Sequence, residues 1–223
     1  MFKSIFPTLI VPVILLGGGC ARTQAPVSIP EAVQEVVSIS TLEDATYMLD
    51  AASSWMKWNA QKRVGAKHNG TIEVNEGALV MQAQEIIGGS FVADMTTIAD
   101  LDLTDKSFNT LLVNHLKSDD FFAVETFPSA TFAIFEVAEL EGIEGATHRV
   151  KGTMTIKGIE NELSFPARIS ALGVGMQATG TATLDRTLWD VRFGSDKFFD
   201  NLGDNLIEDE FTFTFDMRFV ASE

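Results

Sequence analysis

Few side chains in this sequence have the types and spacing that catalysis or metal binding requires. No metal-ligand spacing connects the three histidines, which are His68, His115 and His148. The sequence contains no G-x-S-x-G, H-E-x-x-H or P-loop motif. The acidic stretches at Asp119-Asp120 and at residues 208–210 are typical of solvated loops rather than acid/base sites. We therefore predict no catalytic residue, no metal site and no enzymatic activity.

The single cysteine, Cys20, directly follows residues 1–19, which have the features of a signal peptide. Lys3 gives a basic start, and residues 5–16 form an apolar run too short to span a bilayer comfortably. The sequence LLGGGC resembles a lipobox, except that Gly17 stands where leucine is usual. This resemblance implies that Cys20 is diacylated and becomes the N-terminus of the mature protein. The alternative is ordinary secretory cleavage nearby, which would leave a free thiol.

Residues 20–44 are expected to form a tether, because the stretch after the cysteine places two prolines among small polar residues. An acylated Cys20 would attach the protein to a membrane. Ala21 rather than aspartate follows the cysteine, which in a Gram-negative cell implies sorting to the outer membrane. We therefore expect an exported protein of the cell envelope, lipid-anchored at the periplasmic side of the outer membrane.

The composition limits the partners of this protein. Its formal net charge is −15. Nucleic-acid binding depends on lysine and arginine side chains that neutralise phosphates, so we predict no nucleic-acid partner. The same charge argues against electrostatic docking on anionic lipid headgroups. A chain of 223 residues, 46% of them hydrophobic, is long enough for one domain with a sizeable core, which we place at residues 45–223.

One short α-helix is predicted at residues 107–118. The spacing of a single apolar helix face is present in Phe108, Leu111, Leu112, His115 and Leu116. Asp105 or Ser107 can cap the first free amide groups, and Ser118 begins the polar run that ends the helix.

The rest of the chain alternates between polar and apolar residues with a period of two, which is typical of β-strands. The alternation is clearest in residues 149–157, 162–171, 176–185 and 211–219. Each strand then has one wet and one dry face, which predicts an antiparallel sheet that is covered on one side. The sequences KGIEN and LGVGM have hairpin length, and further turns are expected at Asn69-Gly70, Glu76-Gly77 and Gly88-Gly89. About eight strands would close into an up-and-down barrel or a strongly curled sandwich, so the fold class is mainly β.

Small and large residues share the dry faces of these strands. The interior of an eight-stranded barrel can just be filled by side chains, or it can hold one slender ligand. Small residues on one wall and phenylalanines on the opposite wall allow both outcomes, because either the rings or an apolar chain would fill the space. The candidate cavity residues are Met154, Phe165, Ala167, Ala178, Gly180, Ala182, Phe211, Phe213, Phe215 and Met217.

A cationic stretch interrupts the alternation at residues 185–202. It contains Arg186, Arg192 and Lys197. In an acidic protein these cations could face a polar group of a ligand, or they could pair with the nearby Asp185, Asp190 and Asp196. His115 has two similar interpretations, as a histidine at the edge of the core or as a polar group at the mouth of a cavity.

Four stretches resemble signatures of the YceI-like family of bacterial envelope proteins. They are HLKSDDFF at residues 115–122, ETFPSATF at 125–132, HRVKGTMTIKGIENELSFPA at 148–167 and DRTLWDVRFGS at 185–195. The third resembles the family's G-x-L-T-x-x-G hairpin, with Met154 in place of leucine. The resemblance extends over most of the chain, from about residue 46 to residue 220.

The resemblance implies a lipocalin-like, antiparallel, eight-stranded β-barrel with one short helix, located in the periplasm. It also implies that the barrel holds a long apolar chain, such as a polyisoprenoid, a quinone or a fatty-acyl derivative, with His115, Arg186 and Arg192 at its head-group end. No cofactor is required, although a bound isoprenoid quinone or other lipid would fit, and a dimer is compatible with the sequence. The alternative is a filled barrel that serves as a structural or stress-response module through protein–protein contacts.

Overall fold

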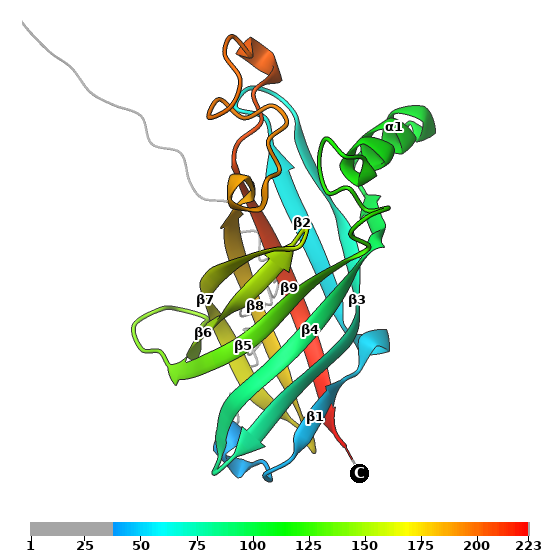
Figure 1. Ribbon diagram of the computed structural model, residues 1–223. Coiled ribbons are helices and arrows are strands. Elements are labelled where there is room, and N and C mark those ends of the chain that lie inside the picture. The colour runs from blue at the N-terminus through cyan, green and yellow to red at the C-terminus, as the bar shows by residue number, and fades with distance from the viewer. Residues whose placement is uncertain (1–37, 223) are drawn as a thin grey trace, which may run out of the picture. The chain divides into compact units, whose positions relative to one another are not determined.

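Nine antiparallel strands make up most of residues 38–222, the part of the chain that the computed structural model describes (Figure 1). The strands are β1 (Thr46–Leu49), β2 (Trp55–Gln61), β3 (Lys67–Gln82), β4 (Glu85–Asp100), β5 (Ser129–Glu139), β6 (His148–Ile156), β7 (Ile159–Leu172), β8 (Gly175–Asp185) and β9 (Glu210–Ala221). One α-helix, α1 (Lys106–Lys117), follows β4. Four short 3-10 turns are η1 (Ile39–Thr41), η2 (Ala51–Ser53), η3 (Arg186–Trp189) and η4 (Gly203–Asn205).

The strands form one closed barrel. They follow the order β1-β3-β2-β9-β8-β7-β6-β5-β4, and the sheet closes because β3 also pairs with β4. The short strands β1 and β2 share one position in the barrel, since each of them pairs with both β3 and β9. The turn η2 separates them. The barrel therefore has eight strand positions, which confirms the predicted mainly β fold with one helix.

The predicted dry faces point into the barrel. On β8, Ala178, Ala182 and Leu184 are buried, whereas Thr181 and Thr183 between them are exposed. Comparable alternation on β6, β7 and β9 places apolar side chains in one continuous core. The period of two in the sequence is thus the direct cause of the wet exterior and the apolar interior.

The N-terminal predictions fall mainly outside the described residues. The signal peptide at residues 1–19 and Cys20 lie there, as does most of the tether predicted at residues 20–44. The last part of that predicted tether is described, and it packs on the barrel through Ile39 and Leu42, which are both buried in the core.

Helix α1 begins and ends within one residue of its predicted bounds. Asp105 is its N-cap, and the carboxylate accepts hydrogen bonds from two amide groups of the first turn. Leu116 is buried, whereas Phe108 and Leu111 are exposed, so only part of the apolar face packs on the protein. The helix lies beside the end of β4 (Figure 1), and Lys117 Nζ there donates a hydrogen bond to the Thr96 carbonyl. No helix within residues 38–222 is long and apolar enough to cross a membrane.

Three of the predicted turns are wrong. Asn69-Gly70 and Glu76-Gly77 lie within β3, and Gly88-Gly89 lies within β4. The chain instead reverses between these strands at Ala83 and Gln84, whose φ angles are 53° and 68°. Asparagine and glycine are the residues that normally adopt this left-handed conformation. Because the turn is made by alanine and glutamine instead, the sequence gives no sign of a chain reversal there. The hairpin in KGIEN is confirmed, with positive φ at Lys157 and Gly158.

The glycines in the strands permit close packing rather than chain reversal. A Cβ atom at Gly70 would overlap the Ala99 carbonyl oxygen and lie 2.6 Å from the indole of Trp58. The absence of that Cβ lets Trp58 lie across β3, where its Nε1 donates a hydrogen bond to the Ala99 carbonyl at 3.1 Å. Glycine inside a strand commonly marks such an approach.

The neighbouring residues Gly88 and Gly89 provide a test of this arrangement. A Cβ at Gly89 would lie 2.5 Å from the Ala78 carbonyl oxygen, whereas a Cβ at Gly88 would meet only the Ile134 carbonyl oxygen at 3.5 Å. We expect Gly89→Ala to lower the free energy of unfolding by about 1–3 kcal/mol, and Gly88→Ala to leave it unchanged or slightly raised. Urea denaturation measures both. A large loss in Gly88→Ala would indicate that the two glycines form a turn after all.

Candidate functional site

An apolar cavity lies inside the barrel. Its volume, measured as the space that the centre of a water-sized sphere can occupy, is about 130 Å³. Thr131 is the one lining residue with a polar side chain. Eight of the ten predicted cavity residues line it: Met154, Phe165, Ala167, Ala178, Ala182, Phe213, Phe215 and Met217.

The volume and lining of this cavity distinguish it from an ordinary packing defect. Protein interiors are close-packed, with few voids larger than one water molecule. A water molecule needs about 10–15 Å³ measured in the same way, so this cavity is about tenfold larger. Its walls offer water almost no hydrogen-bond partner, and such cavities stay dry or take up apolar molecules. The space therefore suits an apolar ligand chain better than it suits water.

The other two predicted cavity residues lie elsewhere. Gly180 pairs with Phe215 on β9, and the ring of Phe215 lies 2.9 Å from where a Cβ of Gly180 would be. The ring thus covers the glycine, which does not line the cavity. Phe211 instead lines a second, smaller apolar chamber, together with Trp58 and Leu116.

The two chambers are neighbours. Ile72, Phe122 and Phe213 line both of them and therefore form the partition between them. Phe122 belongs to the loop that follows α1, whereas Ile72 and Phe213 belong to strands of the barrel. The loop after α1 thus contributes one side of this partition.

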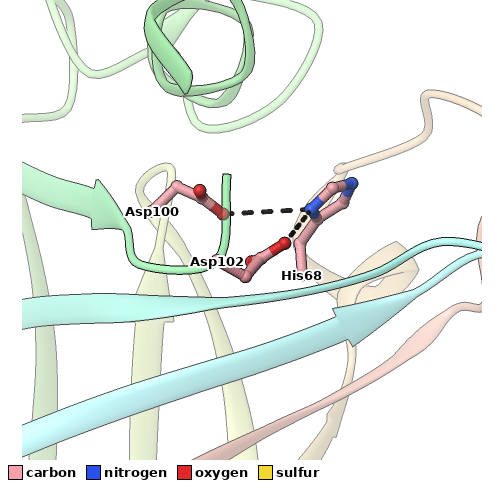
Figure 2. Close-up of side chains that lie close together, drawn as sticks. All are labelled: His68, Asp100 and Asp102. Carbon is pink, nitrogen blue, oxygen red and sulfur yellow. Dashed lines mark hydrogen bonds and ion pairs between the residues drawn. The ribbon is translucent and has the colours of Figure 1, made fainter. Parts of the chain in front are cut away.

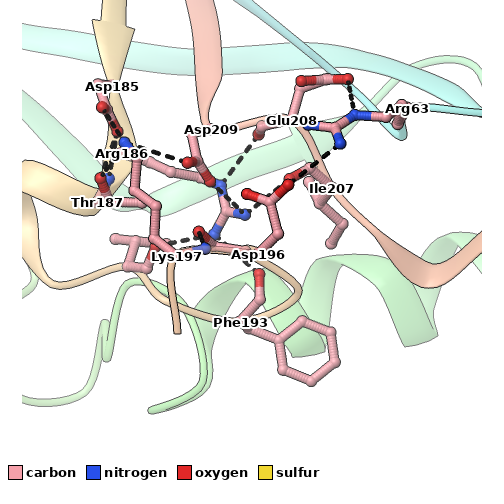
Figure 3. A network of polar contacts seen from close by, with 12 residues as sticks. Arg63, Asp185, Arg186, Thr187, Phe193, Asp196, Lys197, Ile207, Glu208 and Asp209 are labelled. Atoms are coloured by element: carbon pink, nitrogen blue, oxygen red, sulfur yellow. Dashed lines mark hydrogen bonds and ion pairs between the residues drawn. The ribbon is translucent and has the colours of Figure 1, made fainter. Parts of the chain in front are cut away.

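Arg186 lies at the second chamber, but its guanidinium group bonds to the protein (Figure 3). Each of its five N–H groups has an acceptor within 3.4 Å: the carbonyl oxygens of Val191, Phe193, Ile207 and Glu208, and the carboxylate of Asp209. Burial lowers the pKa of Arg186, and Asp209 opposes that effect. No donor is left for a ligand head group, so the guanidinium ties the segment after η3 to the chain just before β9.

The other two predicted head-group residues line neither chamber. The imidazole of His115 packs edge-on against Phe121 and Phe193, with ring centres 4.9 and 4.5 Å away. These contacts join α1 to the segment after η3, since both lie at one end of the barrel (Figure 1). Arg192 is exposed, pairs with Asp190 and lies over the ring of Phe198. A head-group role for His115 and Arg192 stays a prediction.

A polar cluster at the end of the barrel where α1 lies was not predicted. His68 at the start of β3 meets Asp100 at the end of β4 and Asp102 just beyond it (Figure 2). His68 Nδ1 lies 3.0 Å from Asp102 Oδ2 and 3.9 Å from Asp100 Oδ2. The sequence separation conceals this proximity, because only the pairing of β3 with β4 creates it. His68 lies in β3, directly before the residues at which a turn was wrongly predicted.

The two carboxyl groups of this cluster differ in acidity. Burial raises the pKa of Asp100, against the hydrogen bond from the Leu103 amide. Burial also acts to raise the pKa of Asp102, but the hydrogen bond from the Asn69 amide and the neighbouring His68 outweigh it and lower that pKa. The buried carboxyl of Asp100 is therefore the one that takes up a proton more readily.

The role of Arg186 can be tested through stability. Arg186→Lys should lower the free energy of unfolding by about 2–4 kcal/mol, because lysine has fewer donors and leaves buried carbonyl groups without partners. Arg192→Ala is the control, since that side chain is 57% exposed, and we expect a change within about 0.5 kcal/mol. Urea denaturation measures both variants. Wild-type stability in Arg186→Lys would contradict the structural role.

Known proteins resemble this chain in sequence and in fold. The UPF0312 proteins of Staphylococcus aureus strains USA300 and NCTC 8325 are each 36% identical to it over 87 residues, which are 36% of this chain and 46% of each relative. The chain thus spans about half the length of the curated relatives it matches. Burkholderia cenocepacia BcnA has a similar structure, with a TM-score of 0.60, 20% identity, and coverage of 76% of this chain and 98% of BcnA.

A second similar structure is a domain from Saccharophagus degradans, described as a polyisoprenoid binding domain implicated in plant cell wall breakdown. Its TM-score is 0.59 at 14% identity, with coverage of 81% of this chain and 100% of that domain. At these identities, the likeness to both solved structures shows a shared fold. The model of the YceI-like domain matches residues 47–219, which include almost all of the barrel. The chain therefore belongs to the YceI-like domain family, as its sequence signatures predicted.

Proposed function

We propose that this protein binds one long apolar chain inside the barrel, such as a polyisoprenoid, an isoprenoid quinone or a fatty-acyl derivative. The observation that carries the proposal is the apolar cavity, whose lining has a single polar side chain, Thr131. The description of the Saccharophagus degradans domain as polyisoprenoid binding supports it, because the two proteins share a fold. The proposed activity is binding without catalysis.

Burial of an apolar chain can supply the required affinity without any ion pair. Each buried CH₂ group contributes about 0.8 kcal/mol, so a chain that buries ten of them gains about 8 kcal/mol. The loss of ligand motion on binding offsets part of this gain. A chain of such length could still bind with an affinity of biological use, and none of His115, Arg186 and Arg192 would have to contact it.

A filled barrel that acts through protein contacts is the second candidate. The exposed apolar residues Phe108 and Leu111 on α1 favour it, since they are 62% and 65% exposed and could meet another protein. Native mass spectrometry distinguishes the two candidates. The exported Cys20→Ser protein, which lacks the predicted acylation site, should show a discrete additional mass that organic extraction releases. A ligand-free mass from that preparation would favour the protein-contact candidate.

A substitution that fills the cavity should abolish ligand binding. Ala178 is buried on β8 and lines the cavity, so Ala178→Phe would place a ring in the proposed ligand space. We expect the affinity for a dansyl-labelled fatty acid to fall at least about tenfold, as measured by fluorescence titration. Thr183→Phe is the matched control, because Thr183 lies on the outer face of the same strand. Circular dichroism should show both variants folded. Unchanged affinity in Ala178→Phe would place the ligand elsewhere.

We also propose that the protein is an envelope lipoprotein anchored through Cys20. The support is the lipobox-like sequence and the position of the only cysteine in the chain. Cells grown with an alkyne analogue of palmitate should label the wild-type protein, which should fractionate with the outer membrane. Cys20→Ser should carry no label and appear in the soluble periplasmic fraction. An unlabelled wild-type protein would contradict the proposal and favour ordinary secretory cleavage.

A further inference from the structure

The cluster of His68, Asp100 and Asp102 has the construction of an ion-binding site. The side chain of Asp100 is fully buried, and its Oδ2 is the one buried side-chain oxygen or nitrogen within residues 38–222 that has no hydrogen-bond partner. Buried polar atoms are nearly always paired, because an unpaired one loses the hydrogen bonds that water would supply. This oxygen faces His68 Nδ1 (Figure 2), so a partner placed between them would satisfy it.

The surrounding protein holds both carboxylates in position. Asp100 Oδ1 accepts hydrogen bonds from the Leu103 amide at 2.8 Å and from Asn109 Nδ2 at 3.1 Å. Asp102 Oδ1 accepts one from the Asn69 amide at 2.8 Å. Each carboxylate thus has one oxygen tied to the protein, and its Oδ2 is directed toward the imidazole. Hydrogen bonds of this kind are what orient the ligands of metal sites.

The charge of the cluster is not balanced by the described part of the protein. Within residues 38–222, the only ion-pair partner of Asp100 and Asp102 is His68, which carries a charge only when protonated. No lysine or arginine of that part lies within 4.0 Å of either carboxylate. Two carboxylates this close require a compensating positive charge or a shared proton. A divalent cation would provide the charge and the missing partner of Asp100 Oδ2 together.

We propose that His68, Asp100 and Asp102 bind a divalent transition-metal ion, with Zn²⁺ as the representative. One ligand atom from each residue lies within 4.8 Å of the others. Zn²⁺ binds imidazole nitrogen and carboxylate oxygen at about 2.0–2.2 Å, so two ligands of one ion lie about 3–4 Å apart, as the 3.0 and 3.9 Å separations here do.

The donor set determines which ions fit. Imidazole suits Zn²⁺ and its transition-metal neighbours, whereas Mg²⁺ and Ca²⁺ prefer ligand sets made of oxygen alone. The side chains of His68 and Asp102 are 25% and 27% exposed, so water can reach the ion and complete its coordination. Asn109 of α1 bonds to both the carboxylate and the carbonyl of Asp100. Bound metal would therefore fasten the start of α1 to the end of β4.

Zinc titration of the exported Cys20→Ser protein tests the proposal, since the lone thiol is then absent. The protein should be purified without a histidine tag. Isothermal titration calorimetry should give one Zn²⁺ per chain. Zinc at about a hundredfold above its Kd should raise the Tm by about 5–10 °C, because the ion binds only the folded protein. Mg²⁺ at the same concentration should leave the Tm unchanged.

Variants then locate the ion. His68→Gln and Asp100→Asn should each weaken Zn²⁺ binding at least tenfold, and His68→Gln should fold normally because its side chain is partly exposed. His115→Ala is the matched control, since it removes a histidine that pairs with a single aspartate, Asp120, and it should bind Zn²⁺ as before. Binding that survives both His68→Gln and Asp100→Asn would overturn the proposal. So would the absence of saturable binding, in which case the two carboxyl groups share a proton.

Discussion

Hydrogen bonding between β3 and β4 closes the sheet, and both sites described above depend on that closure. A closed antiparallel barrel leaves no exposed edge, and each of its strands turns one face toward a common interior. The pairing puts Ile72, Val74 and Ile86 of these two strands on the wall of the apolar cavity. It also brings the start of β3 beside the end of β4, where His68 meets Asp100. The apolar chamber and the polar cluster are thus two results of one strand pairing.

The open space inside the barrel follows from the sizes of residues on neighbouring strands. Ala167 on β7 and Ala178 on β8 line the cavity with short side chains that fill little of it. The ring of Phe215 lies over Gly180 and leaves the middle of the barrel open. An empty apolar cavity weakens a protein, because its walls lose dispersion contacts and the surroundings relax only partly. A bound apolar chain would restore those contacts. The residues that leave the barrel underpacked would therefore be the same ones that favour the ligand-bound state.

Sequence reasoning succeeded where one physical rule decides the structure. Alternation predicted the inward faces, and apolar spacing with a capping Asp105 predicted α1. It failed where long-range geometry decides. Gly70 and Gly89 were predicted to lie in turns, but each permits close packing against the neighbouring strand. The register of β3 against β4, which includes bulges, could not be read from periodicity, so the cluster at His68 was missed. The cationic residues were visible in the sequence, whereas the acceptors of Arg186 became apparent only when its backbone surroundings were known.

Four of the five acceptors around Arg186 are main-chain carbonyl groups, which every amino acid possesses. The residues that supply them, including Val191 and Phe193, can therefore be replaced during evolution without removing an acceptor. What natural selection would have to preserve is one arginine and the path of the backbone around it. Such an arrangement lets sequences drift apart while this end of the barrel keeps its shape. This chain shares its fold with two solved proteins at only 20% and 14% identity.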